Sequence, residues 1–61
     1  FPVGRRVEHI KSGDIYMVHG HALQEAMLRP LVIYSPLFGI QVRWSRPLQE
    51  MKAKFRLLDA G

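Results

Sequence analysis

The sequence predicts a mostly β fold, a small five-stranded barrel with one short helical turn before the last strand. Five short segments are rich in β-branched and aromatic residues, and glycine or proline punctuates the chain between them. The longer connection over residues 22–28 consists of helix-forming residues instead, and Pro47 precedes the last segment. With 61 residues the chain is expected to be a single domain, residues 1–61.

The first two strands are expected to form a hairpin over residues 5–10 and 15–19. The second of these is rich in β-branched and aromatic residues. Lys-Ser-Gly-Asp at 11–14 is a turn cluster in which Gly13 is free to adopt a positive φ.

Residues 22–28 are expected to form a long connection. Their sequence, Ala-Leu-Gln-Glu-Ala-Met-Leu, consists of good helix formers, but seven residues cannot hold a helix in water unaided. Pro30 also disfavours helical geometry at the residue before it. The connection therefore has room for one helical turn at most, and it carries Leu23, Met27 and Leu28 near the surface.

Residues 31–36 and 40–45 are the third and fourth predicted strands. A three-residue loop that places Gly39 in the left-handed conformation would join them and put Trp44 opposite Val32. A two-residue loop would instead put Trp44 opposite the next residue along the third strand. Both alternatives bury Trp44.

Residues 47–58 fit two periodicities. Apolar residues recur at helical spacing after Pro47, which suits a first helical position, yet from Met51 onwards apolar and basic residues also alternate as in a strand. We expect a helical turn at 47–50 and then a fifth strand to Leu58. Together these elements predict an SH3-like barrel. Its expected core consists of Val18, Val32, Tyr34, Val42, Trp44 and Phe55.

Composition narrows the possible classes of protein. Hydrophobic residues make up 48% and charged residues 23% of the chain, which is typical of a globular domain. A domain of this size buries only about 60% of its unfolded surface, so it usually needs disulfides, a metal or a partner subunit. The chain has no cysteine, which excludes disulfides and thiolate zinc sites and is compatible with the cytoplasm. No apolar stretch approaches the ~20 residues of a membrane span, so no membrane partner is expected. Since the chain begins with Phe1, we expect a processed or excerpted product.

Several short motifs resemble an uncharacterised family of small bacterial domains. That family has a pattern similar to H-x-K-G-x-x-Y-x-V, V-V-Y-x-x-L-Y-G and W-x-R-P-L. The corresponding segments here are His9-Ile10-Lys11-Ser12-Gly13, Tyr16, Val18, Val32-Ile33-Tyr34, Leu37-Phe38-Gly39 and Trp44-Ser45-Arg46-Pro47-Leu48. The resemblance covers residues 7–51 and implies an architecture but no chemistry. Where relatives carry polar residues after the second strand, this chain has Gln24, Ala26 and Met27, which puts any ligand site there in doubt.

Two histidines have a spacing that suits metal ligands. His19 and His21 are two residues apart, so on a regular strand they share a face. The expected hairpin register pairs His9 with Tyr16 and His19 with Arg6, which places His9 on the opposite face unless a bulge intervenes. The ligand set is incomplete, so we expect no metal site and solvent-facing histidines.

Basic residues suggest nucleic-acid binding as an alternative function. Lys52, Lys54 and Arg56 would line one face of the last strand, and Arg43 lies on the preceding one. Aromatic residues for stacking on bases are available in Trp44, Tyr34 and Phe38. The competing interpretation is that edge lysines prevent aggregation and that the aromatic residues form the core.

The favoured hypothesis is a non-enzymatic domain that acts through protein–protein contact. Its partner is expected to be another copy of the chain, in a homo-oligomer, or a different protein. Leu23, Met27 and Leu28 exceed what the predicted core can hold, so they form an exposed interface patch or cap one end of the barrel. No serine has an activated neighbour, no carboxylates form an evident pair, and no glycine-rich phosphate loop is present. We therefore expect neither an enzyme nor a cofactor.

Overall fold

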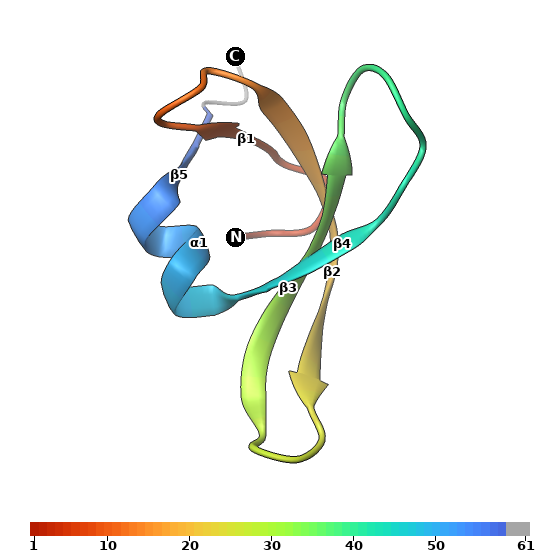
Figure 1. Ribbon diagram of the computed structural model, residues 1–61, viewed down its shortest axis with the longest axis vertical. Coiled ribbons are helices and arrows are strands. Elements are labelled where there is room, and N and C mark those ends of the chain that lie inside the picture. Colours follow the sequence, from red (N-terminus) through yellow and green to blue (C-terminus); the bar gives the residue numbers. More distant parts are fainter. Residues whose placement is uncertain (59–61) are drawn as a thin grey trace.

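The computed structural model describes residues 1–58, which form a five-stranded antiparallel sheet and one short helix (Figure 1). The elements are β1 (Arg6–His9), β2 (Ile15–Gln24), β3 (Arg29–Pro36), β4 (Trp44–Pro47), α1 (Leu48–Lys54) and β5 (Phe55–Leu57). The strand order across the sheet is β4-β3-β2-β1-β5. This confirms the predicted mostly β fold with five strands and a helical segment before the last one.

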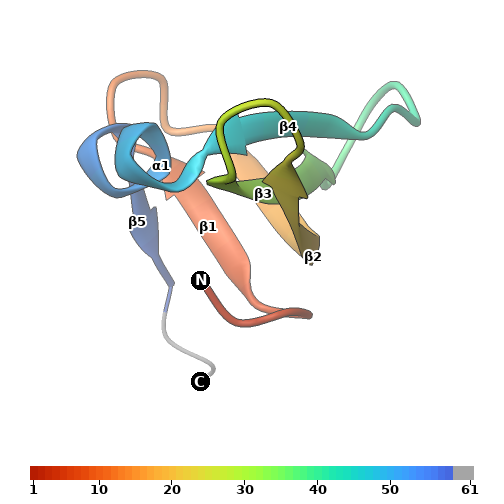
Figure 2. The same cartoon turned by 90° about the horizontal axis from the view of Figure 1, so that it is seen from below.

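The sheet is open, so the word barrel applies only loosely. β4 and β5 are its two edge strands. α1 begins directly after β4 and ends directly before β5, so its seven residues, about 10 Å of helix, connect one edge of the sheet to the other. Figure 2 shows the helix between these two strands. The curved sheet is thus completed by a helix instead of by further strand pairing.

The core lies on the concave face of the sheet, beneath α1. Its buried side chains are Val7, Val18, Val32, Tyr34, Met51 and Phe55. The register explains the arrangement, since Val18 lies opposite Tyr34, and residues that face each other on antiparallel strands share a face. Met51 closes this face from the helix and is fully buried.

Two of the predicted core residues lie elsewhere. Val42 is half-buried in the loop over residues 37–43, and Trp44 is 41% exposed. The prediction that the fourth strand covers 40–45 is wrong, because β4 begins only at Trp44, which pairs with Tyr34. Pro36 has no backbone N–H, so a tight hairpin closed at this residue would lack a hydrogen bond. The chain makes the longer loop instead, with Gly39 at φ 96° as expected.

The predicted connection over residues 22–28 is also wrong, because this segment belongs to a β-hairpin. β2 continues to Gln24, β3 starts at Arg29, and the Leu28 N–H donates to the Gln24 carbonyl at 2.6 Å. Strand pairing provides hydrogen-bond partners for backbone N–H and C=O groups that would bond only to water in a long loop. This gain overrides the helix propensity of these side chains. We call the exposed end of this hairpin, residues 21–30, the β2–β3 arm.

The last segment divides differently from the prediction. The helical turn expected at 47–50 is a helix that continues to Lys54, and the strand expected to reach Leu58 covers only Phe55–Leu57. The helical spacing prevails because it turns Met51 into the core. β5 then pairs with β1 in the register His9↔Phe55.

Candidate binding surfaces

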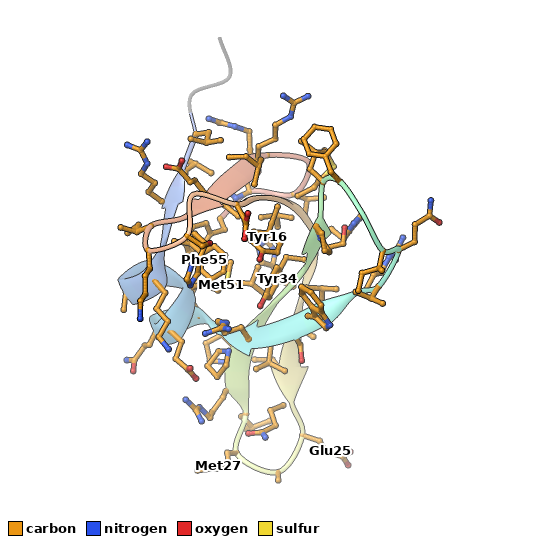
Figure 3. All side chains as sticks on the ribbon, turned by 45° about the horizontal axis from the view of Figure 1, so that its top comes forward. Tyr16, Glu25, Met27, Tyr34, Met51 and Phe55 are labelled. Carbon is orange, nitrogen blue, oxygen red and sulfur yellow. The ribbon has the colours of Figure 1, made fainter. Side chains whose placement is uncertain are left out.

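The β2–β3 arm exposes the three predicted interface residues. Leu23, Met27 and Leu28 are 65%, 70% and 69% exposed, and every residue of the arm is exposed. In Figure 1 the arm extends beyond the rest of the sheet, and Figure 3 places Met27 and Glu25 at its tip. Within residues 1–58, the three apolar side chains therefore do not cap an end of the sheet.

One edge of the arm is free of strand pairing in the described part of the chain. β1 pairs with β2 only as far as Met17, and the backbone of Val18 bonds to Gly4 and Arg5. Beyond this point, from Gly20 to Gln24, the β2 residues pair with β3 on one side only within residues 1–58. Such an edge presents backbone donors and acceptors to another strand.

The predicted basic face of the last strand does not form. Lys52 and Lys54 lie on α1, and Arg43 lies in the loop before β4. Arg56 is on β5, where its Nε donates to Glu8 Oε1 at 2.5 Å. The strand alternation on which the prediction depended is absent because residues 48–54 are helical.

The predicted pair of histidines is divided by a β-bulge. The register between β2 and β3 shifts between Val18 and Gly20, which makes His19 the extra residue and reverses the alternation after it. His19 Nε2 lies 2.6 Å from Ser35 Oγ, whereas His21 Nε2 lies 2.5 Å from the Phe1 carbonyl oxygen. In residues 1–58 no three potential metal-ligating side chains cluster.

A different set of residues gathers on the concave face, where each strand contributes one ring. The rings are those of His9 on β1, Tyr16 on β2, Tyr34 on β3, Trp44 on β4 and Phe55 on β5. They line the hollow that we call the aromatic basin, about 720 Å³ in volume. Its lining consists of His9, Ser12, Tyr16, Tyr34, Arg43, Trp44, Ser45, Arg46 and Phe55.

The rings hold one another through edge-to-face contacts. Tyr16, Tyr34 and Phe55 are mutual neighbours with all three centroid separations at 5.5 Å (Figure 3). His9 stands at 72° to Phe55 with centroids 5.0 Å apart, and Trp44 stands at 65° to Tyr34 with centroids 6.0 Å apart. Interlocked rings of this kind stabilise their own positions by about 0.5–1.5 kcal/mol per pair, so the basin is preorganised.

Arg46 is the central charged group of the basin. Its Nε donates to the Tyr34 hydroxyl at 3.2 Å, and its guanidinium carbon lies 5.6 Å from the centre of the Phe55 ring. The hydrogen bond that Arg46 donates to Tyr34 raises the pKa of Arg46, so the guanidinium stays charged. Its partner Glu50 is 3.8 Å away and exposed, which makes that ion pair weak.

The phenol of Tyr16 stays neutral at physiological pH. Burial, and then the nearby charge of Asp14, raise the pKa of Tyr16 above its usual value of 10.0. The basin therefore offers a hydroxyl that both donates and accepts hydrogen bonds, beside a permanent positive charge.

Most residues of the basin occur in the motifs and strands identified from the sequence, but the sequence pattern does not show that they lie together. The sequence predicts core positions for Tyr34 and Trp44, which are also aromatic residues available for base stacking. His9, Tyr16 and Arg46 belong to the family motifs quoted above, and the resemblance implies only an architectural role for them. The signal that could have united them is register, because opposite residues such as His9 and Phe55 share a face.

Comparisons with protein-family models, curated proteins and solved structures give no match for this chain. In the described residues, no helix has the length and apolar character needed to cross a membrane.

Proposed function

We propose that this is a non-enzymatic domain that acts through protein contact and self-associates through the β2–β3 arm. The observation that carries the proposal is the exposure of Leu23, Met27 and Leu28 together on a hairpin end whose residues 21–30 are all exposed in the described chain. A two-stranded hairpin is marginally stable in water by itself, so a partner that covers the arm also stabilises it.

The occupant proposed for this surface is a second copy of the chain. The free edge of β2 from Gly20 to Gln24 suits antiparallel pairing with the same edge of another copy about a two-fold axis. The arm carries one acid, Glu25, and one base, Arg29, so two arms meet without the repulsion expected from the chain's net charge of +4. Covering two leucine side chains contributes roughly 3 to 6 kcal/mol before the entropy of association is subtracted.

The first test is native mass spectrometry of protein purified without chelator, supported by sedimentation velocity. We expect wild-type protein at a multiple of 7.1 kDa and the double variant Leu23→Ser/Met27→Ser as a folded monomer. Ile10→Ser is the matched control, because Ile10 is 57% exposed but lies outside the arm. A monomeric wild-type chain, or a folded arm variant with unchanged association, refutes the proposal.

We also propose that the chain belongs with the small bacterial domains that its motifs resemble, and that it is an SH3-like domain of the cytoplasm. Five antiparallel strands with a short helix before the last support this architecture. A chain without cysteine suits a reducing compartment.

A nucleic-acid interface on a basic edge face is not retained, because Lys52 and Lys54 lie on the helix and Arg56 pairs with Glu8.

A further inference from the structure

We propose that the aromatic basin binds a nucleotide unit, with the planar base against the rings and the phosphate at Arg43 and Arg46. This site is separate from the arm and does not depend on self-association. The ligand chemistry follows from three properties of the basin, which are the accessible surfaces of its Trp44 and Tyr16 rings, its charge and its polar rim.

The rings offer a stacking surface that the fold itself does not fill. Tyr34 and Phe55, each 4% exposed, form the floor, whereas Trp44 is 41% exposed and Tyr16 is half-buried. An aromatic cluster needed only for the core would be covered, as Met51 covers the neighbouring part of the same face. Stacking of a base on an accessible aromatic side chain is favourable for every base, because each has a π-face.

The charge of the basin selects an anion. Arg43 and Arg46 are among its lining residues, and no carboxylate is among those that line it within the described chain. Glu50 approaches Arg46 only at 3.8 Å, so the guanidinium retains the capacity to bind phosphate. The same two arginines disfavour a cationic ligand, which an aromatic hollow would otherwise attract.

The rim supplies hydrogen-bonding groups for the edge of a base. Ser45 and the neutral phenol of Tyr16 each donate and accept. Ser12 Oγ lies 3.0 Å from His9 Nδ1, which fixes the imidazole at the rim. The volume of about 720 Å³ lies within the range of about 300–1,000 Å³ typical of small-molecule sites.

The experiment is isothermal titration of the full chain with AMP, UMP, adenosine, inorganic phosphate and a single-stranded ten-nucleotide oligo(U). We expect AMP and UMP to bind at least tenfold more tightly than adenosine or phosphate, since both ring and charge contacts contribute. If the natural source is a single strand, oligo(U) binds more tightly than UMP, and its affinity falls with salt by a log–log slope near −0.7 per phosphate contacted. If the source is a free nucleotide, UMP binds as tightly as the oligomer.

Matched variants distinguish nucleotide binding in the basin from non-specific attraction to the positive charge of the chain. Trp44→Leu and Arg46→Gln should each weaken nucleotide binding at least tenfold, with folding checked by circular dichroism. Arg56→Gln removes the same charge from β5 outside the basin lining and should leave binding unchanged. No binding of any nucleotide probe, or equal losses for Arg56→Gln and Arg46→Gln, overturns the proposal. The arm variant Leu23→Ser/Met27→Ser should bind nucleotides as the wild type does, so this site and the self-association proposal fail independently.

Discussion

Tyr34 and Trp44 lie directly opposite each other on β3 and β4, with ring centroids 6.0 Å apart and ring planes inclined by 65°. Tyr34 is 4% exposed and Trp44 is 41% exposed. One cross-strand pair thus connects the buried core to the open basin. A substitution at Tyr34 would therefore remove a packing partner of the accessible Trp44 ring.

The first prediction concerns Met51, the helix residue that closes the core. Met51→Ala should lower the free energy of unfolding by about 2–5 kcal/mol, because it leaves a cavity at a fully buried site. Met51→Leu conserves volume and should cost less than about 1.5 kcal/mol. Urea denaturation measures both. The exposed neighbour Lys52 is the control, since Lys52→Ala should stay within about 0.5 kcal/mol of wild type. A Met51→Ala effect no larger than that of Lys52→Ala would show that α1 does not complete the core.

The second prediction concerns Leu28 in the turn of the arm, the only non-glycine residue with positive φ in the described chain, at 53°. A branched side chain in this conformation costs roughly 1–2 kcal/mol. Leu28→Asn should raise the free energy of unfolding by about 1 kcal/mol, because asparagine tolerates the left-handed region. Denaturation at concentrations where the chain is monomeric tests this. Met27→Asn, at the exposed neighbour without positive φ, should change little, and equal effects of the two changes would contradict the strain argument.

The third prediction concerns pH. The pKa of Tyr16 is raised in the folded protein, mainly by burial and then by Asp14. Between the unfolded and folded pKa values the native state holds more protons, so stability falls as pH rises. The contribution of Tyr16 is therefore complete below pH 10 and is lost above it. Tyr16→Phe should show a shallower loss of stability above pH 10 in denaturation series. Identical pH profiles for the two proteins would be inconsistent with a raised pKa.

The local elements were largely predictable, whereas register was not. Alternation and turn residues identified the first hairpin, and the pairing differs from the expected one by two residues, with Val7 instead of His9 opposite Tyr16. A shift of two keeps each side chain on its face, so Val18 was correctly assigned to the core. The bulge at His19 is marked in the sequence only by Gly20, since an isolated glycine within a strand often accompanies a bulge, and it separates two histidines that simple alternation places together.

The arm and the basin could not be predicted because both depend on tertiary context, which local sequence patterns do not contain. Helix-forming side chains over residues 22–28 gave no indication that strand pairing would continue there. Aromatic residues at strand positions have the same sequence pattern whether or not a helix covers them in the folded protein. The extent of α1 decides this, since it covers the face at Met51 and leaves Trp44 accessible.

The connection of both sheet edges through α1 also affects the order of folding. The pairing of β1 with β5 joins residues such as Val7 and Leu57, so it depends on contacts between the two ends of the described chain. Forming such contacts closes a long loop, and the loss of chain entropy opposes this step before the contacts stabilise the structure. The β2–β3 hairpin is local, whereas Met51 and Phe55 enter the core only once α1 and β5 are available. A nascent or truncated chain without this segment therefore exposes the apolar concave face, which makes such a species prone to aggregation.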